Sequence, residues 1–370
     1  MRTCTYCVMD ESDWKISFDA NGQCNHCRNA LSNFTPPSQN DSRISIVFEE
    51  IRNQKNTNSK YDCVIGLSGG VDSSYLLYLL KNYRLNPLVV HVDAGWNTIE
   101  AIENVQKLVK KFDFDLFTIV MNWKVMKELH IAYLESGVVN QDVPQDHSFF
   151  VGLYEVALRE RIKCVILGSN FASESILPAS WGQSASDGKN IAGIYRARNG
   201  KKLVNYPTKS LFWFTWKIEI SRKLKVYRPL DLIEYDKDVA KSQLIEEFGF
   251  QDYGNKHSES TFTSYFQKIY LPHRFGIDKR KAHLSSMIVS GLISRNDAIE
   301  ELKIPTCSEI QERDLRRYVA TKLGLSVDEL IKFENMPLAN YKDYGYSKYG
   351  MLALRIVQKL KIARRKYKNA

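Results

Sequence analysis

The sequence predicts an α/β protein with a doubly wound parallel sheet, a small cysteine-containing knuckle before the sheet and a helical region after it. Short apolar segments alternate with helix-like segments from Tyr61 to about residue 180. Two Cys-x-x-Cys pairs stand near the N-terminus, and no strand-like alternation follows Phe275. Strands that alternate with helices form parallel sheets, whose ligands bind at the carboxyl ends of the strands.

These changes in pattern divide the chain into four parts. We expect a metal-binding knuckle at 1–35, a polar linker with a short helix at 36–60, a catalytic domain at 61–275 and a helical region at 276–370. The 370 residues exceed one average domain, and 44% hydrophobic content is ample for a core. No apolar run approaches the roughly 18 residues of a membrane span, and the first residues contain no apolar signal. We therefore expect a cytoplasmic protein without membrane insertion.

The knuckle holds four of the seven cysteines, in two pairs separated by sixteen residues. They are Cys4, Cys7, Cys24 and Cys27. A segment this short cannot bury a core, so a metal is expected to stabilise it: four thiolates form a closed, structural Zn²⁺ site with bonds of about 2.3 Å. Two disulfides would suit a cytoplasmic chain poorly. An iron–sulfur cluster, and His26 in place of one cysteine, remain open alternatives.

The alternating region is expected to contain four strands and four helices, because its apolar runs are short and its longer segments have a helical period. The expected strands are 62–67, 87–92, 116–120 and 163–167, and the helices are 73–83, 99–111, 123–135 and 148–161. Residues 181–205 are rich in Gly, Ser and Asn and are predicted as loops over the site. Helices are expected again at 209–224, 236–248 and 261–270.

The junction of the first strand and helix has the composition of a phosphate loop. It reads Ser68-Gly69-Gly70-Val71-Asp72-Ser73-Ser74. Small residues let the backbone approach a phosphate, and the helix begins with N–H groups that have no partner in the helix. The serine hydroxyls add donors, and Asp72 would hold Mg²⁺ or position the loop. We predict that all seven residues bind the nucleotide, with Asp72 and Ser73 also acting in catalysis.

This junction resembles the loop of the ATP pyrophosphatase (PP-loop) superfamily, which has a HUP-like fold. It is not a Walker A motif, because no Gly-Lys-Ser/Thr follows. The resemblance implies that ATP is cleaved between its α- and β-phosphates, with AMP transfer and pyrophosphate release. It also implies nucleotide contacts at the ends of two further strands, from His91, Asp93, Gly168 and Asn170. A hydrogen-bonded core histidine and a turn cap are the alternatives for His91 and Asp93.

Over essentially the whole chain, the sequence also resembles the N-acetyl sugar amidotransferases of bacterial O-antigen and flagellin-glycan biosynthesis. The matching segments are 2–10, 24–27, 68–74, 256–260 and 275–285. The resemblance implies that the acetamido oxygen of a sugar is adenylated and that ammonia then displaces AMP, which leaves an acetamidino group. Adenylation is needed because an amide oxygen is a very poor leaving group, whereas AMP is a good one.

Polar residues in two of these segments are candidates for the sugar site. We expect catalytic roles for His257, Glu259 and Lys279, and substrate contacts for Asp278, Arg280 and His283. Basic side chains suit an anionic sugar nucleotide or sugar acid. Alternatively, Asp278 caps a helix and the Lys279–Lys281 run is a solvated helix face.

The ammonia source is expected to be another protein. Residue 2 is Arg, not the N-terminal cysteine nucleophile of a glutaminase, and no other cysteine lies in a glycine-flanked elbow. The resemblance implies a separate glutaminase of the histidine-biosynthesis type, possibly with its cyclase-like companion. The basic C-terminal tail is a candidate docking site or a solvated helix end. Its basic residues are Arg355, Lys359, Lys361, Arg364, Arg365, Lys366 and Lys368.

Two other functions compete with this interpretation. A tRNA-modifying PP-loop enzyme of the thiolation type would share the AMP chemistry, the metal knuckle and the net charge of +10. Thiolation favours a reactive cysteine in the site, whereas Cys63 and Cys164 lie within strands. A non-catalytic nucleic-acid-binding module would not need the phosphate loop. We therefore consider nucleic acid an unlikely partner.

Overall fold

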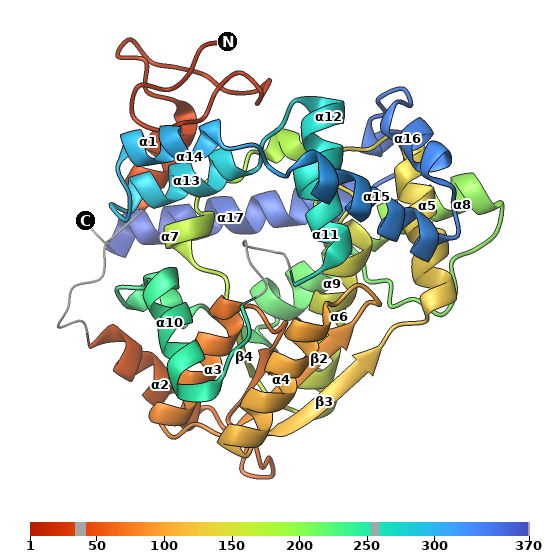
Figure 1. Cartoon of the computed structure of the whole chain (residues 1–370). Helices are drawn as coiled ribbons and strands as arrows, with labels where there is room; N and C mark the ends of the chain where they lie inside the picture. The colour runs from red at the N-terminus through yellow and green to blue at the C-terminus, as the bar shows by residue number, and fades with distance from the viewer. Residues whose placement is uncertain (34–41, 253–258, 369–370) are drawn as a thin grey trace.

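The computed structural model describes residues 1–33, 42–252 and 259–368. At its centre lies a five-stranded sheet in the order β3-β2-β1-β4-β5, in which every pairing is parallel (Figure 1). The strands are β1 Cys63–Gly66, β2 Pro87–Asp93, β3 Asp115–Val120, β4 Cys164–Ile166 and β5 Lys225–Tyr227. The predicted α/β fold with a doubly wound parallel sheet is confirmed.

Helices make up most of the remaining described chain. The α-helices are α1 Asn25–Asn33, α2 Arg43–Asn53, α3 Val71–Asn82, α4 Ile99–Phe112, α5 Trp123–Ser136, α6 Val143–Arg159, α7 Phe171–Glu174, α8 Gly188–Asn199, α9 Leu211–Phe214, α10 Lys237–Phe248, α11 Thr261–Tyr265, α12 Leu271–Phe275, α13 Arg280–Val289, α14 Arg295–Lys303, α15 Glu309–Leu323, α16 Val327–Glu334 and α17 Lys348–Lys368. Shorter 3₁₀ or π-helical turns are η1 Ala179–Trp181, η2 Thr215–Ile220, η3 Pro229–Leu232, η4 Phe266–Tyr270 and η5 Tyr341–Tyr344.

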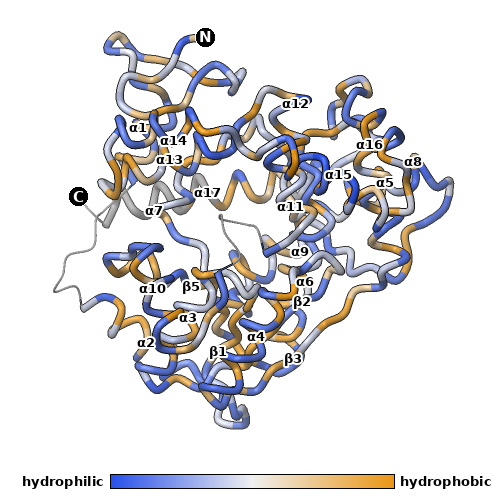
Figure 2. The backbone as a smooth tube through the Cα atoms, in the orientation of Figure 1, coloured by the Kyte–Doolittle hydropathy of each residue, from blue (hydrophilic) through white to orange (hydrophobic). Residues whose placement is uncertain are grey.

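Both faces of the sheet are buried, because successive strand residues point to opposite faces. In β1, Cys63 and Ile65 pack with α2, α3, α4 and α10, whereas Val64 packs with α5, α6 and α8. Figure 2 shows the strands as mainly hydrophobic segments. In this arrangement the carboxyl ends of β1, β2 and β4 face the C-terminal helices α11 and α13 (Figure 1).

Several elements differ from the predicted pattern; for example, α6 begins five residues before the helix predicted at 148–161. A helix, α8, lies within the region predicted as loops: Asp187 caps its first turn and Gly200 ends it in the left-handed conformation. Ile191, Ile194 and Tyr195 are buried at helical spacing, but the polar residues around them hide this period in the sequence. The strand β5 was also not predicted, because three half-buried residues give too short a pattern and only pairing with β4 defines them.

The four-cysteine knuckle and the C-terminal helices lie together on the side of the molecule away from α2 and α4 (Figure 1). The long helix α17 packs against α9 and η2. Among the described residues, no helix combines the length and the apolar composition that crossing a membrane requires.

Candidate functional site

The phosphate loop joins β1 to α3 and keeps its shape through its own backbone. Gly69 has a φ of +85°, and a Cβ there would lie 2.3 Å from the carbonyl oxygen of Ala101, so only glycine fits. Gly70 is the N-cap of α3 and supplies no side-chain cap. The amide of Gly70 donates to Ser68 Oγ at 3.2 Å, and Ser73 Oγ donates to the Gly70 carbonyl at 3.2 Å. The loop is thus an ordered helix N-terminus suited to an anion.

Buried polar groups without protein partners surround this loop. Ser74 is fully buried, and its hydroxyl has no hydrogen-bond partner among the described residues. The same holds for Ser169 Oγ and for the Nδ2 of Asn170, a residue that is 2% exposed. A Cβ on Gly168 would lie 3.0 Å from the amide nitrogen of Ser73, so the end of β4 touches the loop. Unpaired buried donors are costly unless a ligand or water satisfies them, and phosphate oxygens would do so here.

The end of β2 is tied to the loop through His91. Because the Leu67 carbonyl can only accept, His91 Nδ1 donates to it at 2.8 Å, and Nε2 then accepts from Asn97 Nδ2 at 3.1 Å. The imidazole therefore has both nitrogens satisfied within the protein. Asp93 accepts a hydrogen bond from the Gly95 amide at 2.7 Å, as a turn cap does. His91 therefore supports the start of the loop, whereas Asp93 caps the turn that follows β2.

Asp72 projects from the first turn of α3 and is oriented from outside the loop. The Tyr235 hydroxyl, in the segment before α10, donates to Asp72 Oδ1 at 2.5 Å. Asp72 is half-buried, so its other oxygen can face a ligand. A carboxylate beside a phosphate-binding loop has the donor chemistry that Mg²⁺ prefers. Asp72 is the residue of this loop that fits a magnesium ion.

The C-terminal candidate residues separate into two groups. His257 lies outside the described residues. The Glu259 carbonyl accepts from the Thr98 amide at 2.9 Å, so this segment runs beside the end of β2. Lys279 is the N-cap of α13, with its ammonium group 5.9 Å from the Phe266 ring centroid. His283 Nδ1 lies 2.8 Å from the Ser173 carbonyl, just beyond the end of β4. These segments therefore lie at the carboxyl ends of the strands, where the phosphate loop also lies.

Asp278 and Arg280 are engaged with the protein itself. The Arg280 guanidinium donates to Asp278 Oδ2 at 2.7 Å through Nη2 and at 3.1 Å through Nε. Its Nη1 donates to the Ile304 carbonyl at 2.9 Å. This arrangement fixes the start of α13 to the end of α14, and it leaves Arg280 few free donors for a substrate.

Sequence reasoning missed a pair of acids at the N-terminus of α6. Asp142 is the N-cap, and Asp146 lies one turn later. Burial raises the pKa of Asp142 to about 7 and that of Asp146 to about 6, and the Lys279 charge opposes this rise at both residues. The signal in the sequence was the spacing of two acids by four residues around Pro144. Such spacing is common on solvated helices, and only the fold shows that Asp142 is buried and Asp146 half-buried.

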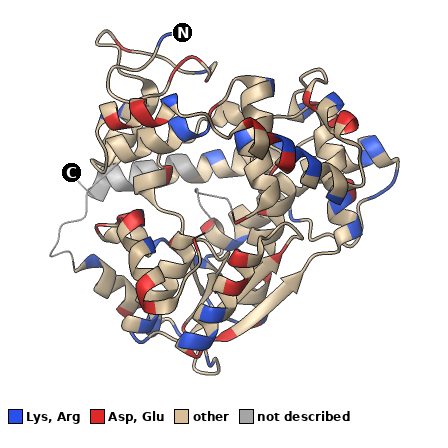
Figure 3. Ribbon diagram, in the orientation of Figure 1, with Lys and Arg blue, Asp and Glu red and all other residues tan. Residues whose placement is uncertain are grey.

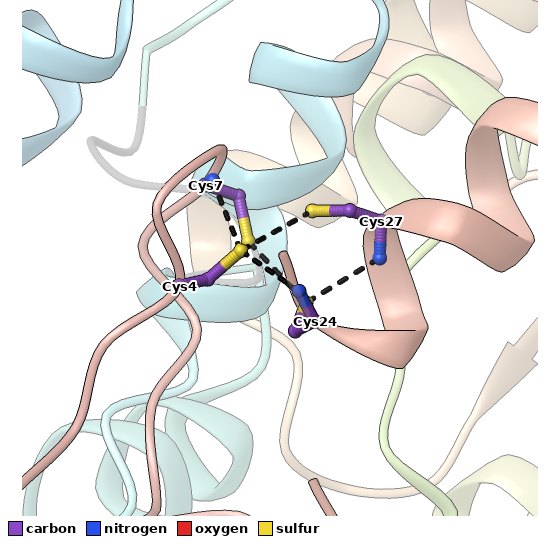
Figure 4. Close-up of side chains that lie close together, drawn as sticks. All are labelled: Cys4, Cys7, Cys24 and Cys27. Atoms are coloured by element: carbon purple, nitrogen blue, oxygen red, sulfur yellow. Dashed lines mark hydrogen bonds between the residues drawn. The ribbon is translucent and has the colours of Figure 1, made fainter. Parts of the chain in front are cut away.

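The four cysteines of the knuckle converge on one point (Figure 4). All four are fully buried, and their sulfur atoms lie within 4.8 Å of one another. The distances are 3.9 Å for Cys4 Sγ to Cys27 Sγ and 3.8 Å for Cys7 Sγ to Cys24 Sγ. Tetrahedral coordination with bonds of about 2.3 Å separates sulfur atoms by about 3.8 Å. The geometry thus fits a zinc knuckle, whereas a multinuclear iron–sulfur cluster would hold the sulfurs farther apart.

Hydrogen bonds among the four sulfurs lower the pKa of Cys4 and Cys24 and raise the pKa of Cys7 and Cys27, so the thiols share protons when no cation is bound. A bound cation would favour the thiolate form of all four. His26 is not a ligand: its Nε2 lies 2.6 Å from Asp13 Oδ2, and the metal-binding group found among the described residues contains only the cysteines. The open alternative of a histidine ligand is therefore wrong, because Asp13 holds the ring.

The knuckle is fastened to the C-terminal helices. Arg295 Nη2 donates to the Cys4 carbonyl at 3.0 Å, and its Nε donates to the Cys7 carbonyl at 3.1 Å. Lys281 on α13 forms a salt bridge with Asp10. The metal site thus anchors the same helix whose N-cap is Lys279. This position suits a structural role.

The basic tail begins on helix α17 with Arg355. Arg355 is exposed on α17, and nothing is described of the other basic side chains of the tail. Elsewhere, Lys and Arg residues are interspersed with Asp and Glu over the helices (Figure 3). Whether the tail docks a partner stays a prediction.

Residues 259–361 match the family model described as "LPS biosynthesis protein WbpG-like, C-terminal domain". This part of the chain is therefore similar to the C-terminal domain of WbpG-like proteins. It includes Lys279 and His283, and it starts at the segment that runs beside β2.

Relatives match only parts of the chain. The uncharacterized protein MJ1599 of Methanocaldococcus jannaschii is 37% identical over 116 residues, which are 30% of this chain and 40% of that protein. The tRNA(Ile)-lysidine synthase of Chlamydia felis is 40% identical over 58 residues, 16% of each. Among solved structures, the U34-tRNA thiolase NcsA from Methanococcus maripaludis, with its [4Fe-4S] cluster, aligns with a TM-score of 0.35 and 15% identity, covering 84% of this chain and 93% of that one. The matched segments span less than half the length of MJ1599 and of the lysidine synthase.

Proposed function

We propose that this protein is an ATP-dependent amidotransferase that converts an N-acetyl group of a surface-glycan sugar to an acetamidino group. One observation supports the proposal: the region that matches the WbpG-like model lies at the carboxyl ends of the strands, where the phosphate loop also lies. Ser260 forms a β-bridge with Asn97 beyond β2, and His283 contacts the Ser173 carbonyl beyond β4. A region related to lipopolysaccharide biosynthesis would thus present its substrate to a nucleotide site.

The first step would join the sugar's acetamido oxygen to the α-phosphorus of ATP and release pyrophosphate. The α3 N-terminus and the hydroxyls of Ser68, Ser73 and Ser74 would bind the phosphates, and the Asn170 amide fits the same role. Asp72, oriented by Tyr235, would hold a magnesium ion, which supplies charge neutralisation for the departing pyrophosphate. These groups align oxygen and phosphorus, and alignment is a large part of catalysis in such transfers.

In the second step ammonia would attack the imidate carbon, and AMP would leave. The ammonia is proposed to come from a separate glutaminase of the histidine-biosynthesis type, possibly with a cyclase-like companion. The substrate is proposed to be a sugar nucleotide or sugar acid whose anionic part lies near Lys279. In this proposal Zn²⁺ at the four cysteines keeps α13 in place, and the protein acts in the cytoplasm.

The test is incubation of the full chain with ATP, Mg²⁺, ammonium chloride and a panel of UDP-linked N-acetylhexosamines, their uronic acids and CMP-linked N-acetylated nonulosonic acids. We expect one class to stimulate AMP and pyrophosphate formation and to yield a product in which NH replaces the carbonyl oxygen by mass spectrometry. Bulk tRNA is the comparison substrate. Stimulation by tRNA alone would replace the proposal with tRNA modification, the function favoured by the short lysidine-synthase similarity.

A further inference from the structure

The acid pair on α6 lies at the carboxyl ends of the strands, where the phosphate loop begins. Helix α6 leads into β4 and therefore runs opposite to the parallel strands, with its N-terminus at their carboxyl ends. Leu153 packs on Gly66 at the end of β1, where a Cβ would lie 3.4 Å from the Leu153 Cδ2 atom. Asp146 precedes Leu153 by seven residues, two turns along the same helix face. At 1.5 Å per residue this places Asp146 about 10 Å further along α6, beyond the end of β1.

Hydrogen bonds connect Asp142 to Leu67, the residue that precedes the phosphate loop. His91 binds the Leu67 carbonyl and Asn97, and Asn97 forms the bridge with Ser260. Ser260 Oγ then donates to Gln145 Oε1 at 3.1 Å.

The path continues within α6. Gln145 Nε2 donates to Asp142 Oδ1 at 3.3 Å, and Thr263 Oγ1 donates to the same oxygen at 3.2 Å. Asp142 is thus a fixed, hydrogen-bonded member of the site. Asp146 differs, because its carboxylate accepts no hydrogen bond from a described residue, only the Lys279 charge acts on it, and its side chain is half-buried.

The charged groups around Asp146 have a net charge that would attract one small cation. Lys279 acts on both acids from α13, and Tyr206 faces Asp146 from the segment after α8. His147, next along α6, is held by the Ala185 carbonyl at 2.5 Å and the Lys209 amide at 3.1 Å. Two carboxylates against one ammonium group carry net negative charge when both are ionised. Independently, the unpaired buried donors at Ser74 and Asn170 indicate a ligand in the phosphate loop, at the same end of the strands as the N-terminus of α6.

We propose that Asp146 is the catalytic group that receives the ammonium ion and accepts its proton. The assignment rests on the proposed amidotransferase function. One N–H bond of ammonium breaks, and its proton goes to the Asp146 carboxylate. The freed electron pair forms the bond to the imidate carbon, and the C–O bond to AMP breaks with its electrons on AMP. One further proton moves from the new nitrogen to the imidate nitrogen, which gives the amidinium product.

Asn is the matched substitution, because it keeps the volume of Asp146 and breaks no hydrogen bond to a described residue. Asp146→Asn is expected to keep sugar-dependent ATP–pyrophosphate exchange, measured without ammonium, near the wild-type rate. Amidine formation at pH 7 is expected to fall about 100-fold, the usual size of a lost general base. Between pH 7 and 9 the rate of amidine formation by Asp146→Asn should rise in proportion to the concentration of free ammonia. In the wild type, the pH–rate profile of amidine formation should rise near pH 6, where Asp146 loses its proton.

Glu155→Gln, lower on the same helix and exposed, is the control, and both rates should stay at the wild-type level. Equal loss of exchange and amidine formation in Asp146→Asn would assign the residue to ATP or Mg²⁺ binding and overturn the proposal. Unchanged amidine formation would also overturn it. Absence of sugar-dependent exchange in wild type is a different result, because it removes the amidotransferase function itself and the assignment with it.

Discussion

The phosphate loop and the four-cysteine knuckle are both ligand sites, but they are held in opposite ways. The loop is shaped by backbone: Gly69 adopts a left-handed conformation, and the Ser68 and Ser73 hydroxyls bind the loop's own amides and carbonyls. The knuckle has sulfur atoms at its centre, and all four cysteines are fully buried. A ligand that is exchanged at each turnover needs a site that is complete without it. A resident ion can instead be part of the fold.

The largest effect is expected from breaking the backbone of the loop. Gly69→Ala would put a Cβ 2.3 Å from the Ala101 carbonyl oxygen at a φ of +85°, so the loop must shift. We expect AMP formation to fall about 100-fold or more, because small misplacements at reacting groups cost that much. Gly249→Ala is the control: it has a φ of +64° with no atom within 4 Å, so it should lose about 1 kcal/mol of stability and no activity. Normal AMP formation by Gly69→Ala would refute the claim that the backbone conformation at Gly69 shapes the phosphate loop.

A smaller effect on chemistry, with a large effect on stability, is expected from the knuckle. Cys24→Ser should remove the bound metal, about one ion per chain, and lower the melting temperature. ATP binding should change only a few-fold, since the loop does not depend on the ion. Elemental analysis and calorimetry measure these changes. Cys307→Ser, half-buried and outside the cluster, should keep the metal. Full metal content in Cys24→Ser would mean that the four sulfurs do not act as one site.

The smallest change tests whether the loop keeps donors for a ligand. Ser74 and Ser286 are both fully buried serines, but Ser286 Oγ donates to the Ala282 carbonyl and accepts from the Ile176 amide, whereas Ser74 Oγ has no described partner. Ser74→Ala should raise the KM for ATP about 10-fold, as one charged hydrogen bond would, and leave stability unchanged. Ser286→Ala should lower stability by about 1 to 3 kcal/mol and leave the KM unchanged. Reversed results would show that Ser74 is a structural hydroxyl.

The two sites were predictable from the sequence for a shared reason. Residues 68–74 are contiguous, and their glycine and serine content specifies the turn that they form. The cysteine pairs have the spacing of a metal knuckle, and their convergence follows once an ion is assumed. The helix α8 was missed because its buried residues stand among polar ones. The acids of α6 were missed because their spacing also occurs on ordinary solvated helices.

The sequence by itself determined the parallel sheet, the phosphate loop after β1 and the four-cysteine site, because each depends on neighbouring residues and local periodicity. Only the tertiary structure brought together Asp142 and Asp146 on α6, Lys279 before α13 and Ser260 beside β2. It also committed Arg280 to Asp278 and His26 to Asp13. The physical reason is that burial and charge pairing depend on how segments pack in space. Neither the short spacing of Asp278 and Arg280 nor the separation of Gln145 from Ser260 by more than a hundred positions specifies that packing.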